Sequence, residues 1–219
     1  MVSWDSDALQ IPATAYAQML AAIPNMDTQD FLRKWTTIGK KHLRADDVYS
    51  RKFSLGSAAY EFLFLTGMPS EFLDLNFDYL QESLETVNQK LSLDNSNYDK
   101  YLAIGFNGSG DPIAINLITQ ELIYLNHDND FEEVFINSDM KRFALSVLCI
   151  QSFIEQLRKL NADSFFESEF SDEQLEHLIR DLNIIDPKAF EIDNGHWKST
   201  LDYYKWERDD ERGTAANKM

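Results

Sequence analysis

Four short apolar runs between residues 70 and 136 constrain the fold of this chain more than any other feature. They are rich in Ile, Leu, Tyr and Phe, are separated by turn residues, and span 72–80, 98–106, 111–118 and 121–128. Parallel strands need a crossover of about a dozen residues, usually a helix, and we find no helical crossover between these runs. The link 119–121 is short enough for a hairpin. The pattern therefore predicts an antiparallel meander.

Helical periodicity appears on both sides of these runs. Apolar side chains recur at every third or fourth position from Phe143 to Leu157, which predicts the buried face of a helix of about twenty residues. We expect Ser138 to cap this helix. Ser171 and Gln174 form a capping box at the start of another helix. Four further helices are expected, at 13–23, 28–44, 54–66 and 193–206.

The helix expected at 54–66 has a start signal at one end and stop signals at the other. Ser54 or Ser57 would cap its start, Gly67 would occupy the position just past its end, and Pro69 prevents continuation.

Helices on both sides of the strands predict an α+β fold, with a twisted antiparallel sheet flanked by helices in a single domain. We divide the chain into three parts: a helical segment packed on the domain (1–52), the α+β domain (53–206) and a frayed C-terminal tail (207–219).

Negative charge is concentrated in the middle of the chain. The formal net charge is −17, and residues 53–140 contribute −13 of it, with two Lys or Arg against fifteen Asp or Glu. A field of this sign repels nucleic acid and anionic membranes, and it attracts basic partners. Solubility alone also explains such a charge, and the sequence leaves both explanations open.

The sequence also bears on location. It contains no run of about 18 apolar residues that would span a bilayer. Its first residues, MVSWDSDALQ, lack the basic and apolar regions of a signal peptide. The single cysteine, Cys149, rules out an intramolecular disulfide and is expected to be a small buried side chain. We therefore expect a cytoplasmic protein that binds neither membranes nor nucleic acid.

A glycine-rich loop, Asn107-Gly108-Ser109-Gly110-Asp111, raises the question of a phosphate site. A phosphate-binding loop leads from a strand into a helix, whose amides hold the anion. Here Pro112 and a strand-like run follow the loop, and the carboxylate of Asp111 would repel phosphate. Asn and Gly supply the positive φ angles that turns require. The loop therefore predicts a turn.

Patterns for catalysis or metal binding are weak. His127, Asp128 and Asp130 lie close in sequence, but one histidine with carboxylates in a polar loop is usually a solvated turn. The chain has no Gly-x-Ser-x-Gly elbow and no His-Glu-x-x-His motif. We therefore expect no catalytic residues, no metal site and no cofactor. A metal-dependent hydrolase built on loop 127–130 is the alternative.

The order of three segments resembles the SUKH superfamily, which includes a yeast regulator of cell-wall synthesis and many bacterial immunity proteins. The segments are FLFLTGMPSEF, with Gly67 and Pro69 after an aromatic helix; YLAIGFNGSGDPIAINLITQELIYLNHD, with three strands and two turns; and FINSDMKRFALSVL. A late tryptophan, Trp197 in FEIDNGHWKSTLDYY, is similar to the tail of the fourth branch. The resemblance covers residues 53–204.

The resemblance implies an α+β fold and residues with structural roles. Gly105 and Gly110 would shape the first hairpin, and Asn137 with Ser138 would seat the helix that follows. It also implies a non-catalytic role, in which the protein binds the toxic domain, often a nuclease, of a polymorphic or contact-dependent toxin system. An intracellular regulatory scaffold that binds several cellular proteins is the alternative function.

Nuclease toxins are basic because they hold a polyphosphate, and an acidic inhibitor would capture them quickly. We therefore expect partner contacts among acidic residues in the loops beside the sheet: Asp94, Asp99, Asp128, Asp130, Glu132 and Glu133. A merely solvated surface explains each of them as well. Tyr98 and Tyr101 are expected to be either interface anchors or core residues.

Overall fold

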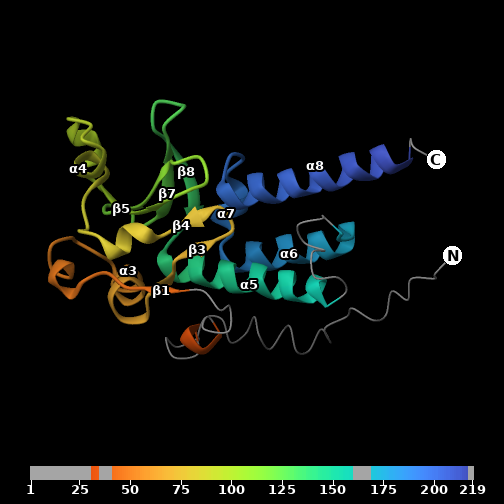
Figure 1. Ribbon diagram of the computed structural model, residues 1–219, viewed down its shortest axis with the longest axis horizontal. Coiled ribbons are helices and arrows are strands. Elements are labelled where there is room, and N and C mark those ends of the chain that lie inside the picture. Colours follow the sequence, from red (N-terminus) through yellow and green to blue (C-terminus); the bar gives the residue numbers. More distant parts are fainter. Residues whose placement is uncertain (1–30, 35–40, 160–168, 217–219) are drawn as a thin grey trace.

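The computed structural model describes residues 31–34, 41–159 and 169–216, the last six of these as backbone only. A six-stranded antiparallel sheet lies at its centre (Figure 1). The strands follow one another in chain order: β3 Glu71–Phe72, β4 Leu75–Asn76, β5 Tyr101–Phe106, β6 Pro112–Asn116, β7 Leu122–Asn126 and β8 Glu132–Asn137. A separate pair joins β1 His42–Leu43 to β2 Met68–Pro69. The predicted antiparallel meander is confirmed.

Helices precede and follow the sheet, so the predicted α+β class is confirmed. Before it come α3 Ser57–Tyr60 and the π-helical turn η4 Glu61–Thr66. After it come α5 Met140–Arg158, α6 Asp172–Ile185, α7 Lys188–Glu191 and α8 His196–Ala216. The remaining helical turns are short: η3 Asp47–Tyr49, η5 Asp78–Gln81, α4 Val87–Leu91 and η6 Ser96–Tyr98. In the described part of the chain, every helix is too short or too polar to cross a bilayer.

The main core lies between one face of the sheet and the helices α5, α6 and α8. Leu102 and Ile104 of β5 point into it, and Phe143 of α5 is fully buried there against the rings of Phe77 and Trp197. Figure 1 shows α5 and α6 side by side below α8. The periodicity predicted from Phe143 to Leu157 is therefore the buried face of α5.

The opposite face of the sheet carries a second, smaller core. Tyr101 and Ala103 of β5 point into it and pack with Val87 of α4 and with Ile123 and Leu125 of β7. An antiparallel sheet often leaves one face to solvent, but α4 and η6 cover this face. Residues on both faces of the sheet are consequently apolar, which explains why apolar and polar residues alternate only weakly along the strands.

Two helix starts differ from the sequence prediction. Asp139, not Ser138, caps α5, because its carboxylate accepts a hydrogen bond from the Arg142 amide at 2.8 Å. Ser138 instead donates hydrogen bonds to the buried carboxylate of Asp186. At α3 the residue before the helix is Gly56, so neither Ser54 nor Ser57 is its cap. The predicted capping box of Ser171 and Gln174 at α6 is confirmed.

The prediction of a helix at 28–44 is wrong at its C-terminal end, because His42 and Leu43 form strand β1. The Ser70 amide donates to the Lys41 carbonyl at 2.8 Å, so pairing with the distant β2 outweighs the local helical preference. Residues 31–34 are helical, and the helix expected at 13–23 lies outside the described residues.

The run at 72–80 is also more broken than the single strand expected there. Leu73 has a φ of 52°, which turns the chain between β3 and β4. The side chain of Asn76 then accepts the Asp78 amide at 2.8 Å and starts η5.

At the other end of the chain, the last helix is longer than expected. It continues to Ala216, so the domain boundary expected at residue 206 falls inside α8.

Glycines are required at two of the predicted structural positions. Gly67 ends η4 with φ 85° and ψ 176°, a conformation that is almost restricted to glycine. Gly105 lies at a bulge of β5, where a Cβ atom would come within 1.9 Å of the Asn76 carbonyl oxygen. Pro69 lies in β2 and pairs with His42. Gly110 has a φ of 85° in the turn between β5 and β6.

Candidate functional site

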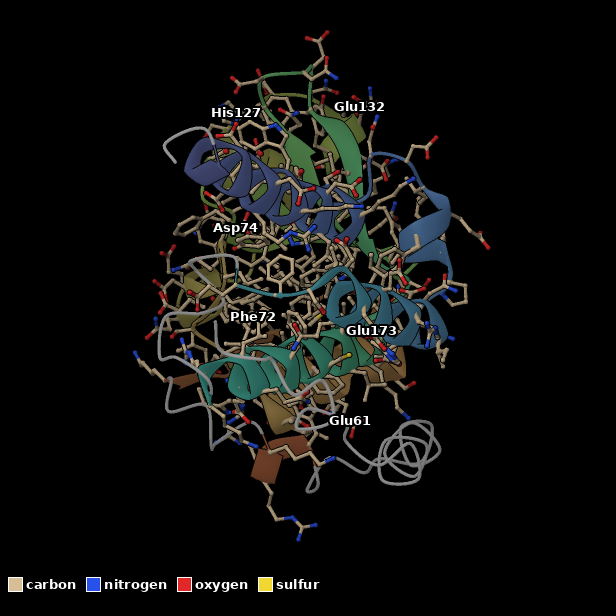
Figure 2. All side chains as sticks on the ribbon, turned by 90° about the vertical axis from the view of Figure 1, so that its right-hand side faces the viewer. Glu61, Phe72, Asp74, His127, Glu132 and Glu173 are labelled. Atoms are coloured by element: carbon tan, nitrogen blue, oxygen red, sulfur yellow. The ribbon has the colours of Figure 1, made fainter. Side chains whose placement is uncertain are left out.

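The six acidic residues named from the sequence lie in two segments that meet. Asp94 and Asp99 flank η6, and the others lie in or beside the β7–β8 turn: Asp128, Asp130, Glu132 and Glu133. The ring of Tyr98 in η6 packs against Phe131 in that turn, with the ring centroids 5.3 Å apart. All six acidic side chains are exposed. We call these six residues the acidic edge; Figure 2 shows Glu132 at the top of the molecule, away from α5 and α6.

Aromatic side chains support the acidic edge from below. Tyr101 is buried, and its ring centroid lies 6.3 Å from that of Tyr98, which is half-buried. The Tyr101 hydroxyl donates a hydrogen bond to Glu133, and burial together with this bond raises the pKa of Tyr101. Tyr101 is therefore a core residue, and Tyr98 is partly one. Lys100 completes the group, with its Nζ atom 3.5 Å from Glu133 Oε1.

Local hydrogen bonds fix the backbone of the acidic edge. The Asp128 amide donates to the Asn126 side chain at 3.0 Å, and Asp130 has a φ of 49°, as tight turns require. Asp99 accepts the side-chain amide of Asn88 at 2.8 Å, which joins η6 to α4. The acidic side chains consequently project from a backbone whose conformation is fixed.

Positive charge is sparse around this surface. Within the described ranges, Glu133 is the one member of the acidic edge that forms an ion pair with a lysine or arginine. Lys90, the other cation of residues 53–140, pairs with Glu82 and lies over the ring of Tyr79. The acidic edge therefore presents uncompensated carboxylates, which attract a basic partner.

The glycine-rich loop is a turn, as predicted. It joins β5 to β6, and the side chain of Asn107 accepts the Ser109 amide at 3.0 Å and the Asp111 amide at 2.9 Å. Asp111 is buried and accepts the backbone amide of His127 at 2.9 Å. Burial raises the pKa of Asp111, but hydrogen bonds from His127 and Asn107 outweigh it and lower the pKa overall. The loop thus braces the β7–β8 turn and has no helix that would hold a phosphate.

His127 faces carboxylates on both of its ring nitrogens. Its Nδ1 atom lies 2.5 Å from Asp111 Oδ1, and its Nε2 atom lies 3.4 Å from Asp128 Oδ1. Across the described residues, no group of three or more His, Cys, Asp or Glu side chains is arranged to hold a metal ion. The contacts of His127 are those of a residue that joins two turns.

The residues expected to seat α5 form a buried polar cluster. Asn137 donates to Asp186 at 2.9 Å and accepts the indole N–H of Trp197 at 2.8 Å. Ser138 donates to Asp186 through its amide at 2.7 Å and its hydroxyl at 2.8 Å. The cluster joins the end of β8 to the α6–α7 junction and to the start of α8. Asp186 was not identified from the sequence, where it stands among 37 acidic residues without a motif of its own.

Sequence reasoning also missed an exposed aromatic pair on α8. Trp206 and Tyr203 are 62% and 54% exposed, and their ring centroids lie 6.1 Å apart. The sequence indicates for both only that they lie on the final helix. Their positions in the sequence were a usable signal. Tyr203 and Trp206 are three residues apart, so they share one face of the helix, and neither continues the spacing of the buried residues Trp197 and Leu201.

The fold and the acidic edge define the class of protein: an α+β protein whose antiparallel sheet is a meander and whose surface carries uncompensated negative charge. The sequence model of the SUKH-4 immunity protein family matches residues 36–203, and the chain belongs to that family. The resemblance to the fourth SUKH branch is thereby confirmed, and the match begins earlier in the chain than the resemblance did. No curated protein and no solved structure matches the chain.

Proposed function

We propose that this chain is a non-catalytic immunity protein that binds a cognate bacterial toxin domain and blocks it. Its family is one of immunity proteins, which generally act by binding. We propose further that the toxin domain is basic, that it is a nuclease of a polymorphic or contact-dependent system, and that the complex forms in the cytoplasm.

The observation that carries the proposal is the acidic edge. Five of its six carboxylates form no ion pair with lysine or arginine in the described part of the chain. Solvation alone would explain each carboxylate taken singly. The packing of Tyr98 on Phe131, however, brings the two segments that carry them together on one surface. A surface of one sign raises the association rate with a partner of the other sign, and this matters where a single free toxin molecule is harmful.

Inhibition would follow from the charge of the partner. A nuclease holds its substrate through basic residues, and the carboxylates of the acidic edge would compete with phosphates for these. No proton transfer or bond cleavage is required of the chain.

Co-expression with the toxin domain encoded beside this gene tests the proposal. We expect survival of the host and co-purification of a one-to-one complex at low salt, with slower assembly at about 0.5 M salt. If neither rescue nor a complex is observed although the chain is folded and the toxin is active, the proposal is contradicted and the scaffold that binds several cellular proteins is favoured.

A further inference from the structure

The middle of α8 carries an aromatic face that the described part of the protein does not bury. Trp197, Leu201 and Arg208 face inward and are at most 4% exposed. Trp206 points the other way, at 62% exposed, beside Tyr203. Figure 1 shows α8 leaving the sheet and continuing as a long straight helix toward the C-terminus.

Arg208 holds the middle of α8 in place. The guanidinium group of Arg208 donates to the Phe170 carbonyl at 3.2 Å, to Asp172 at 2.5 Å and to Asp209 at 2.7 Å. It also lies over the Phe170 ring, 5.2 Å from the centroid. The inward face of α8 is therefore anchored to Phe170 and to the first residue of α6, and the outward face is presented in a fixed orientation.

The neighbours of Trp206 on the helix surface are chemically specific. Residues three and four positions apart are adjacent on an α-helix. For Trp206 these neighbours are Asp202, Tyr203, Asp209 and Asp210, so an exposed indole lies among three carboxylates and a phenol. All four are themselves exposed. We call Trp206 and these four neighbours the α8 face.

We propose that the α8 face docks the cognate toxin domain through a basic patch, with Trp206 as the anchor. This inference rests on the proposed function. Exposed tryptophan and tyrosine are favoured at the centres of protein interfaces, and an indole binds the cation of an arginine or lysine over its ring. The exposed carboxylate of Asp202 on the same face attracts the same cation, whereas Asp209 already pairs with Arg208. A second copy of this chain fits poorly, because two acidic faces would repel each other within a protein of net charge −17.

The test compares the affinity of four forms of the full chain for the toxin domain encoded beside this gene, measured by calorimetry. Trp206→Ala is expected to raise Kd about thirtyfold or more, and Trp206→Phe by less. Ile118→Ala is the matched control, since Ile118 is an apolar side chain that is 75% exposed at the β6–β7 turn. We expect its Kd to stay within about threefold of wild type.

Each outcome discriminates. If wild type does not bind, the proposed function fails and this inference with it. If wild type binds and Trp206→Ala binds equally well, the inference is overturned and the proposed function stands. A wild-type dimer that Trp206→Ala converts to monomers, with unchanged toxin affinity, would show that a second copy occupies the α8 face. Because Trp206 lies outside the core, its alanine variant should keep the wild-type melting temperature, which verifies folding.

Discussion

Asn137 shows how a single side chain can hold three parts of the fold. Its amide group donates to Asp186 and Ser146 and accepts from the Trp197 indole, and all four side chains are buried or nearly so. Buried polar groups destabilise a protein when one partner is lost, because the others then have no water to replace it. Asp186 is the acceptor on which this cluster depends.

Replacement of Asp186 by alanine should lower the free energy of unfolding by about 3 kcal/mol, since it leaves three donors of Asn137 and Ser138 without an acceptor. Denaturant unfolding measures the change. Glu173→Ala, at an exposed position of α6, is the control and should be close to neutral. A loss below about 1 kcal/mol for Asp186→Ala would show that the cluster contributes little to stability.

His196 makes stability depend on pH. It is buried between Tyr124 and Trp197, and its Nε2 atom has no hydrogen-bond partner among the residues that the structure describes. Burial lowers the pKa of His196, although the charge of Asp74 acts in the opposite direction. His196 therefore stays neutral in the folded chain at pH values below 6.5, the ordinary pKa of the side chain, where it is protonated in the unfolded chain. Stability is full above that pH and falls as the pH drops below it.

We expect the free energy of unfolding to fall on acidification below about pH 6.5, by up to about 1.4 kcal/mol per pH unit for this group. His196→Leu should flatten the dependence and His177→Leu, exposed on α6, should not. His42 contributes in the same direction, since burial lowers its pKa too, so some dependence persists in His196→Leu. An unchanged slope in that variant would contradict the assignment.

At the scale of elements, the approach of β4 to β5 depends on Gly105. We predict that Gly105→Ala lowers the free energy of unfolding by about 3 kcal/mol, because its Cβ atom would collide with the backbone of Asn76 and force the strands apart. Gly108→Ala is the matched control: its nearest neighbour is a side-chain atom of Asp74 at 3.5 Å. It should change stability by less than about 0.5 kcal/mol, and equal losses at both sites would contradict the prediction.

The elements also show what the sequence predicts and where it stops. The meander, the capping box of α6 and the buried face of α5 follow from local patterns, and all three are correct. The strand at His42–Leu43 is missed because its partner, β2, is distant in sequence. The cap of α5 is one residue off because Ser138 is taken by Asp186, a contact across 48 positions that no local pattern contains.

At the scale of the whole molecule, the candidate site is also predicted only in part by the sequence. The excess of acidic residues in 53–140 is visible in the sequence. The assembly of six of them into the acidic edge depends on the contact of Tyr98 with Phe131, and the engagement of Glu133 by Tyr101 and Lys100 also requires the fold. The α8 face was missed because its aromatic residues lie on a helix whose opposite side is buried.

Charge on the acidic edge should control how fast the chain captures its toxin. We consider two double variants with the same change in net charge: Asp128→Lys with Glu132→Lys on the acidic edge, and Glu173→Lys with Glu176→Lys on α6. All four positions are exposed. Figure 2 shows Glu132 and Glu173 on different parts of the molecule, so the pair of variants separates local from total charge.

The most direct measurement is the association rate constant with the toxin domain encoded beside this gene, by stopped flow between about 0.05 and 0.5 M salt. We predict that the wild-type rate falls at least about tenfold across this range, that the acidic-edge variant is slower at low salt with a flatter dependence, and that the α6 variant stays close to wild type. A wild-type rate that is independent of salt, or equal slowing in both variants, would contradict capture by the acidic edge.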